Sequence, residues 1–348
     1  MTEEVLFAQK GQIGIITLNR PNALNALTLP MILSLQHQLN LWKIDNSIKA
    51  VILKAAPGGV FCAGGDVRRL FQLGKSNVAK QMQFFWHEYK LNHFIHHFGK
   101  PYIALMDGIT MGGGVGISLH GSHPVASENF VFAMPETSIG FFPDIGASYL
   151  LTQCKGSLGI YLGLTGNRLG PNDSLKAGLV KYLISSQKME QIIRTLSTMD
   201  LSTEAYAQVD SCLKEHSSSL GNEPSQIKPL IDVCFSHPTV ELINSSLEQT
   251  EGVWAESIYN TLGKKSPLSL KITLAQLQKA QGLSLVECLQ MDYNLVNHFM
   301  MDHDFYEGVR ALLVDKDKAP QWNPSRLELI SKQTITNYFV PATTSLQL

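Results

Sequence analysis

Two glycine-rich turns, each placed directly before a helical pattern, hold the residues of this sequence most suited to chemistry. The first ends in Gly64 and Gly65, and the second contains the three consecutive glycines at 112–114. Such a turn leaves backbone N–H groups unpaired at the positive end of a helix, where they can bind developing negative charge. We therefore expect Gly65 and Gly113 to donate to one oxyanion, although a single turn of this kind more often serves close helix–strand packing. Neither turn has the GxGxxG pattern of a dinucleotide site.

Two carboxylates follow in a segment that prolines and glycines should hold rigid. Glu136 and Asp144 lie eight residues apart, and each directly follows a proline. Paired carboxylates in different environments can divide nucleophile or base work from substrate orientation. Taken alone, two surface acids in a turn would be the more ordinary interpretation. A third acid, Glu88, lies in a helix-compatible stretch crowded with aromatic residues, and it either reaches solvent or faces a cavity.

Neither the histidines nor the cysteines indicate a metal site. His93, His96 and His97 lie close together, but no acidic residue stands at ligand spacing from them, and we interpret them as a polar helix face. The five cysteines are widely spaced and include no CxxC pair: Cys62, Cys154, Cys212, Cys234 and Cys288. We therefore expect no disulfide and no structural zinc, and we interpret Cys62 as a small apolar filler of the first turn.

The overall composition is that of an ordinary globular protein without a general attraction for polyanions. Of the 348 residues, 44% are apolar, and 28 Lys and Arg stand against 29 Asp and Glu. This balance argues against nucleic acid and membrane surfaces as partners. No apolar run reaches the roughly 20 residues of a membrane-spanning helix. The acidic start shows no targeting pattern, so we expect a cytoplasmic protein, or a mitochondrial-matrix protein if the sequence is a mature form.

Short elements of alternating type must position the candidate residues. The pattern predicts a hairpin over 5–8 and 12–18, a helix over about 28–45, and strands over 50–54, 101–106 and 130–132. Each glycine turn joins a strand to a helix, and this alternation predicts an α/β sheet. Beyond residue 184 helix-compatible segments dominate. We therefore predict a core domain over 1–200 and a helical C-terminal region over 201–348 that completes the binding site.

Four motifs together resemble the enoyl-CoA hydratase/isomerase, or crotonase, superfamily over nearly the whole chain. They are an opening loop at 15–21 with 25–27, the two glycine turns at 61–66 and 107–114, and a closing motif at 303–322. The resemblance implies a crotonase-like ββα spiral core with a helical C-terminal region. It also implies an acyl-CoA substrate whose thioester carbonyl is bound by the two glycine turns.

Two positions distinguish reactions within this superfamily. Its hydratases usually carry two glutamates, one three residues after the second oxyanion glycine and the other twenty residues later. In this sequence the first position is Gly116, and only the second is an acid, Glu136. The segment 134–144 is similar to the signature of the 3-hydroxyisobutyryl-CoA hydrolases. The resemblance therefore implies hydrolysis of that thioester, or of a similar short 3-hydroxyacyl-CoA, to the free acid and CoA, as in valine catabolism.

The resemblance also implies roles for individual residues. Glu136 would act on the thioester, either as a nucleophile or as a base for water, and Asp144 would contact the 3-hydroxyl end of the substrate. Glu88 and Gly113 match further substrate-contacting positions. Gly146 stands in a stretch where a run of glycines is common in the resembled enzymes, and this departure implies a different pocket shape.

Binding of the CoA phosphates needs cations. Arg20, Lys316 and Lys318 are the candidates, because they lie in the opening and closing motifs. No cofactor or metal is expected beyond the CoA of the substrate itself. Superfamily members often form trimers, so a homo-oligomer is a possible assembly.

Two other functions stay open at this point. An enoyl-CoA hydratase or isomerase would share the oxyanion turns but would need another acid in place of Gly116. A noncatalytic subunit of a larger assembly would be expected to lack the catalytic carboxylates, whereas Glu136 and Asp144 are present.

Overall fold

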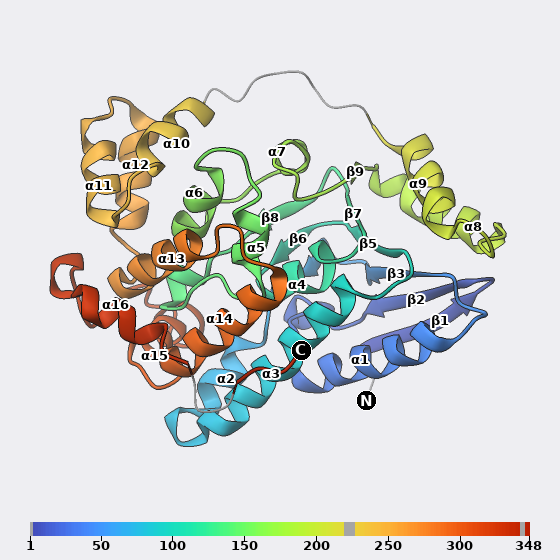
Figure 1. Ribbon diagram of the computed structural model, residues 1–348, viewed down its shortest axis with the longest axis horizontal. Coiled ribbons are helices and arrows are strands. Elements are labelled where there is room, and N and C mark those ends of the chain that lie inside the picture. The colour runs from blue at the N-terminus through green and yellow to red at the C-terminus, as the bar shows by residue number, and fades with distance from the viewer. Residues whose placement is uncertain (1–2, 219–226, 342–344) are drawn as a thin grey trace. The chain divides into compact units, whose positions relative to one another are not determined.

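The computed structural model describes residues 3–218, 227–341 and 345–348 (Figure 1). Contacts between residues divide the chain into two compact units, each assembled from three separate stretches. Unit 1 consists of Met1–Gly65, His87–Phe132 and Arg168–Asn222, and unit 2 consists of Asp66–Trp86, Ala133–Asn167 and Glu223–Leu348. The predicted division at residue 200 follows the order of the chain, whereas these units do not. That division stays a prediction.

A six-stranded sheet forms the centre of unit 1. Its strands, in spatial order, are β1 (Val5–Lys10), β2 (Ile13–Leu18), β3 (Ala50–Ala55), β5 (Tyr102–Met106), β7 (His123–Ala126) and β9 (Tyr182–Leu183). β1 and β2 form the predicted antiparallel hairpin, and every later neighbour is parallel. Parallel strands require crossover connections that place helices on the sheet, so their apolar runs are buried on both faces. Ile13, Ile52 and Ile103 are fully buried accordingly.

A second, smaller sheet carries the glycine turns. Its spatial order is β4 (Val60–Cys62), β6 (Ile109–Met111) and β8 (Val131–Ala133). β4 and β6 are parallel, with Val60 opposite Ile109. Because parallel neighbours end at the same edge of a sheet, the segments that follow β4 and β6 begin side by side. These segments contain Gly65 and Gly113, so the strand pairing brings the two turns together.

The helices of unit 1 cover the large sheet. They are α1 (Leu29–Ile44), the later part of α3 (Val78–His96), α4 (Gly113–Leu119), α7 (Pro171–Lys176), α8 (Ser186–Thr198) and α9 (Ala205–His216), with the short η1 (Pro21–Ala23). The side chain of Thr28 caps α1 by accepting from the Met31 N–H at 3.3 Å. In α8, Met189, Ile192, Ile193 and Leu196 are buried at helical spacing and join the core cluster of the sheet.

Unit 2 is almost entirely helical. Its helices are α2 (Val67–Leu73), α5 (Ala147–Leu151), α6 (Leu158–Thr165), α10 (Lys228–Phe235), α11 (Val240–Gln249), α12 (Val253–Leu262), α13 (Pro267–Lys279), α14 (Leu285–Phe299), α15 (Asp304–Val309) and α16 (Lys332–Tyr338). Shorter turns are η2 (Lys75–Asn77), η3 (Glu136–Ile139), the π-helix η4 (Arg310–Val314) and η5 (Leu327–Leu329). α10, α11 and α12 pack consecutively against one another (Figure 1). The described chain contains no strand after β9, as the sequence predicts.

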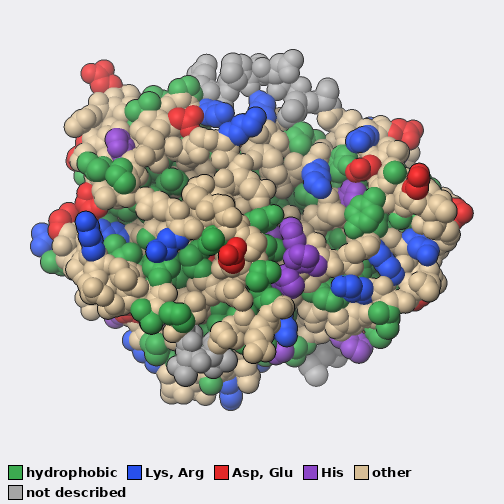
Figure 2. All heavy atoms as spheres, in the orientation of Figure 1, with side chains coloured by type: hydrophobic (Ala, Val, Ile, Leu, Met, Phe, Trp, Pro, Cys, Tyr) green, Lys and Arg blue, Asp and Glu red, His purple; other side chains and the backbone are tan. Residues whose placement is uncertain are grey.

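The described residues include no helix that is both long and apolar enough to cross a membrane. On the face drawn in Figure 2, basic and acidic side chains are interspersed, and neither sign covers a continuous area. This distribution agrees with the near balance of 28 basic and 29 acidic residues in the sequence.

Candidate active site

The two glycine turns meet in unit 1, as the sequence predicts. A methyl group built on the Cα of Gly113 would lie 3.2 Å from the backbone nitrogen of Gly65. Leu27 forms a bridge with Gly65 and fixes the first turn, with its N–H donating to the Gly64 carbonyl at 2.8 Å. In the described part of the chain, neither the Gly65 nor the Gly113 N–H donates to a backbone carbonyl. Neither N–H is therefore occupied by a backbone carbonyl, and donation by both groups to one ligand oxygen stays a prediction.

Glu88 lies beside the second turn. Its side chain is buried, with 2% of its surface exposed, so it does not reach solvent. A methyl group on Gly113 would overlap its carboxylate, which shows how closely Glu88 approaches the turn. A larger residue at this position would displace the Glu88 carboxylate, because α3 packs here against the first residue of α4. The expectation that Glu88 contacts substrate stays a prediction, and its position at the glycine turn is compatible with it.

One helical turn further along α3, Asn92 fills the space beside Gly116. A methyl group built on Gly116 would lie 2.7 Å from the Asn92 amide nitrogen and 2.8 Å from its oxygen. Asn92 is fully buried, and neither amide atom has a hydrogen-bond partner among the described residues. Gly116 is the position where hydratases of the resembled superfamily carry their first glutamate. Here a side chain at that position would overlap the Asn92 amide unless Asn92 moved.

Cys62 precedes the first turn and packs as an apolar residue. It is fully buried, and its thiol lies 3.1 Å from the Asn25 carbonyl oxygen. Burial raises the pKa of the Cys62 thiol to about 12, and the charge of Glu88 adds to this effect. A thiol that stays protonated is not a nucleophile.

In unit 2, Glu136 begins the short helix η3 and is held in a buried position. Only 7% of its surface is exposed. The rest of η3 is fixed by hydrogen bonds: the Thr137 hydroxyl donates to Leu164 at 3.0 Å, and the Lys265 ammonium donates to the Ser138 hydroxyl at 2.6 Å. These contacts hold the two residues that directly follow Glu136.

The charges around Glu136 set its basicity. Burial, and then the negative charge of Asp144, raise the pKa of Glu136 well above its ordinary value, and the positive charge of Lys265 opposes them. Burial in turn lowers the pKa of Lys265 to about 8. A carboxylate with a raised pKa is a stronger base once it is ionised, which suits proton abstraction or attack on a carbonyl.

Asp144 is also buried, with 6% of its surface exposed. It belongs to the same unit as Glu136, and each carboxylate lies within electrostatic range of the other. A third buried acid, Asp292 of α14, interacts with Asp144. Burial raises the pKa of Asp292 well above its ordinary value, and the charge of Asp144 raises it further.

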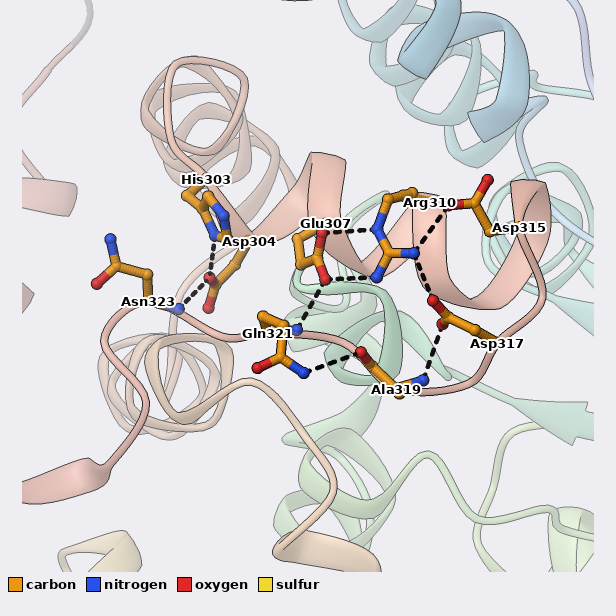
Figure 3. A network of polar contacts seen from close by, with 9 residues as sticks. All are labelled: His303, Asp304, Glu307, Arg310, Asp315, Asp317, Ala319, Gln321 and Asn323. Atoms are coloured by element: carbon orange, nitrogen blue, oxygen red, sulfur yellow. Dashed lines mark hydrogen bonds and ion pairs between the residues drawn. The ribbon is translucent and has the colours of Figure 1, made fainter.

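A network of charged residues shapes the closing motif in unit 2 (Figure 3). The Arg310 guanidinium binds Glu307 in a bidentate pair, with N···O distances of 2.9 and 2.7 Å. It also donates to Asp315 at 2.8 Å and to Asp317 at 2.6 Å. These carboxylates raise the pKa of Arg310 further above its ordinary value. Arg310 thus folds the chain around Lys316, which lies between two of its partners.

The three predicted CoA-binding cations differ in their surroundings. Lys316 and Lys318 are exposed, and both adopt left-handed backbone conformations with φ of 61° and 57°. Arg20 lies in unit 1, where its side chain pairs with Glu4 at 3.0 Å and donates to the Ala26 carbonyl at 3.0 Å. Arg20 thereby holds the opening loop. Binding of CoA by these residues stays a prediction.

Of the three histidines predicted to lie on a polar helix face, His93 and His96 lie at the end of α3 and His97 directly follows it. The ring of His97 lies 4.4 Å from that of His93 and 4.8 Å from that of His96, centroid to centroid. Burial lowers the pKa values of His93 and His96, and the neighbouring imidazoles lower them further. Over residues 3–218, 227–341 and 345–348, no three His, Cys, Asp or Glu side chains are arranged to hold a metal ion.

Four residues beside the candidate site were missed by sequence reasoning: Asn92, Lys265, Gln276 and Asp292. For two of them, the sequence does contain a signal. Asp292 interrupts the apolar stripe of α14 formed by Leu289 and Val296, and Gln276 interrupts that of α13. A polar residue on a buried stripe indicates a buried hydrogen-bond network.

Comparisons of this sequence with known proteins agree on one family. A model of the enoyl-CoA hydratase/isomerase family matches residues 13–339. The 3-hydroxyisobutyryl-CoA hydrolase, mitochondrial, of Danio rerio is 43% identical over 97% of this chain and 89% of its own length. The protein of the same name from Homo sapiens is 42% identical over 97% of this chain and 88% of its own length.

Among solved structures, a carnitinyl-CoA dehydratase from Mycobacterium thermoresistibile superposes with a TM-score of 0.92 at 33% identity, covering 99% of both chains. An enoyl-CoA hydratase from Rhodobacter sphaeroides gives a TM-score of 0.89 at 32% identity, covering 99% of this chain and 100% of its own. These similarities confirm the predicted crotonase-like α/β fold with its helical C-terminal region.

Proposed function

Because the chain belongs to the enoyl-CoA hydratase/isomerase family, we propose that it hydrolyses a short 3-hydroxyacyl-CoA thioester to the free acid and CoA. The substrate is 3-hydroxyisobutyryl-CoA or a close analogue, as in valine catabolism. Relatives that bear the name of that hydrolase match 97% of the chain at 42–43% identity.

The observation that carries this choice within the family is the contact between Gly116 and Asn92. A hydratase adds water across a double bond with two carboxylates, one of them at this position in the resembled enzymes. Here the position is a glycine, and the amide of Asn92 fills the space beside it. The second carboxylate, Glu136, is retained and buried. One carboxylate and an oxyanion hole suffice for thioester hydrolysis.

In the proposed mechanism, the thioester oxygen accepts hydrogen bonds from the Gly65 and Gly113 N–H groups. Each such donor stabilises the transition state by about 3–4 kcal/mol. Glu136 then either attacks the carbonyl carbon, so that CoA leaves as its thiolate and water cleaves the mixed anhydride, or takes a proton from the attacking water. Both routes develop charge on the same oxygen. The reaction needs no cofactor besides the CoA of the substrate.

Asp144 is proposed to bind the 3-hydroxyl group of the substrate, with Glu88 as a further substrate contact. An acyl group without that hydroxyl would lose this hydrogen bond to Asp144, a loss of about 1–3 kcal/mol or about 5- to 160-fold in rate. Arg20, Lys316 and Lys318 are proposed to bind the phosphates of CoA, for which flexible or guanidinium cations are suited.

The first test compares CoA-thiol release from 3-hydroxyisobutyryl-CoA and from crotonyl-CoA. We expect rapid release from the former, and a loss of about 10²- to 10⁴-fold in Glu136→Gln. Glu128→Gln is the matched control, because Glu128 is exposed and accepts from the Ser186 N–H in unit 1. Hydration of crotonyl-CoA without thiol release would instead favour an enoyl-CoA hydratase. A stable complex with other proteins and no turnover would favour a noncatalytic subunit.

The cellular compartment and the oligomeric state of the protein are also proposed from its similarity to the family. The names of the relatives place those proteins in mitochondria. For this chain we propose the mitochondrial matrix or the cytoplasm, and cell fractionation distinguishes the two. The proposed homo-oligomer is tested by the molar mass of the purified chain in light scattering.

A further inference from the structure

The loop that carries Asp144 is held from both sides by two buried residues of unit 2. The Asp292 carboxylate accepts from the Gly146 N–H at 2.8 Å. The Gln276 amide donates to the Pro143 carbonyl at 2.9 Å. The same amide donates to the other oxygen of Asp292 at 2.7 Å, which joins the two contacts into one network. The residues on either side of Asp144 are thus connected through side chains of α13 and α14.

This network is buried throughout. Asp292 and Gln276 are both fully inaccessible to solvent. Desolvation of a carboxylate and an amide is unfavourable unless their hydrogen bonds are made, so a buried pair of this kind indicates a requirement for a fixed geometry. If packing were the only requirement, apolar residues of similar volume would stabilise this region at least as well.

The backbone of the loop gives independent support. Ile145, between Asp144 and Gly146, has a φ of 59° and is buried with 1% of its surface exposed. A β-branched residue rarely adopts this left-handed conformation, which persists only where the surroundings impose it. Such strain concentrates at functional sites because it directs a neighbouring side chain. Here that neighbour is Asp144.

We propose that Asp292 and Gln276 are positioning residues that determine selectivity for the 3-hydroxyl group by holding the loop of Asp144. The inference rests on the proposed function, in which Asp144 binds that hydroxyl. Asp292 touches no reacting atom in this scheme. Its loss changes which acyl groups are hydrolysed, because a displaced Asp144 no longer distinguishes a substrate with the hydroxyl from one without it.

The experiment measures the ratio of kcat/KM for 3-hydroxyisobutyryl-CoA to that for isobutyryl-CoA in Asp292→Leu, Asp292→Asn and Gln276→Met. Hydrogen–deuterium exchange of the peptide containing Gly146 is followed in the same variants. Asp232→Leu is the matched control, because Asp232 also accepts from a loop N–H in unit 2, that of Ser157 at 2.8 Å.

In Asp292→Leu we expect the ratio to fall about 10- to 100-fold and exchange at Gly146 to accelerate by a similar factor. Asp292→Asn retains an acceptor oxygen for the Gly146 N–H but turns an amide N–H toward the donating Gln276 amide, so it should recover only part of the ratio, and the Asp232→Leu control should leave it unchanged. A folded Asp292→Leu with the ratio and the exchange of the wild type would overturn the inference. If that variant does not fold, Gln276→Met decides by the same two measurements.

Failure of the proposed function is a separate result. If the wild-type chain releases no thiol from either thioester, the hydrolase proposal is wrong. The positioning inference is then decided by exchange at Gly146 and by the relative affinity for the two thioesters in calorimetry. Unchanged exchange together with unchanged relative affinity would reject it.

Discussion

Lys265 is a cation whose charge acts on Glu136, the proposed catalytic carboxylate. Its ammonium donates to Ser138 in the helix of Glu136, and its charge favours the ionised carboxylate. Removing that charge in Lys265→Met should raise the pKa of Glu136 further. Since the reaction needs ionised Glu136, we expect the acidic limb of the kcat/KM profile to move to higher pH.

A pH series on 3-hydroxyisobutyryl-CoA measures this shift. Lys264→Met is the matched control, because Lys264 is the exposed neighbour of Lys265. Lys265→Arg keeps the charge and should restore the position of the limb. A limb that stays in place in Lys265→Met would mean that Lys265 only fills space.

Gly116 allows a direct test of what the missing hydratase glutamate means. We expect Gly116→Glu to gain no crotonyl-CoA hydration and to lose about 1–3 kcal/mol of stability, because the new side chain would overlap buried Asn92. Urea unfolding and a hydration assay measure both effects. The double variant Gly116→Glu with Asn92→Ala opens the space and should recover part of the stability. Full stability of the single variant would contradict the observed packing.

At the scale of elements, the packing of α15 on η3 depends on glycine. A methyl group on Gly140 would overlap the Asp304 carbonyl, and Gly140 has a φ of 68°. We expect Gly140→Ala to destabilise the protein by more than the roughly 1–2 kcal/mol of a left-handed alanine. Thiol release should fall as well, because Gly140 directly follows the helix of Glu136.

The control for this change is Gly282→Ala. Gly282 has a φ of 77°, but no heavy atom lies within 4 Å of the site of its methyl group. Gly282→Ala therefore loses only the stability that a left-handed alanine costs. The difference between the unfolding free energies of the two variants in urea gives the contribution of the α15 packing. Equal losses in both variants would show that the contact with Asp304 contributes nothing.

Local patterns in the sequence predict a large part of these elements. The hairpin, α1 and β3 match their predicted ranges to within a few residues. Each glycine turn lies next to the strand that it terminates. Gly65 and Gly113 could therefore be recognised from the adjacent strand pattern. The network around Asp144 could not be predicted in this way. Gly146 and Asp292 are separated by 146 positions, and only folding of the chain brings them together.

At the scale of the whole molecule, the buried acids lower stability at neutral pH. The pKa of Glu136 is higher in the folded chain than in the unfolded one, so the folded state binds more protons between the two values. The free energy of unfolding therefore falls as pH rises through this interval. We expect Glu136→Gln to melt at a higher temperature than the wild type at pH 8, with the difference vanishing below about pH 4.

Glu128→Gln is the control for this prediction, and its melting temperature should change in the opposite direction. Hydrogen bonds from Ser186 lower the pKa of Glu128, so its charge stabilises the folded chain at neutral pH. Glu128→Gln should accordingly melt at a lower temperature at pH 8. Calorimetric scans at pH 4 and pH 8 measure all three proteins, and a Glu136→Gln variant that loses stability at pH 8 would contradict the raised pKa.

The interleaving of the two units has a consequence for how the chain is made. Unit 1 is complete once residue 222 has been synthesised, whereas unit 2 needs the stretch that ends at Leu348. Glu136 and Asp144 leave the ribosome early, whereas the helices of unit 2 that carry their partners, α13 to α15, are translated more than 100 residues later. A premature stop codon late in the gene therefore removes the surroundings of these two residues while leaving their own codons intact.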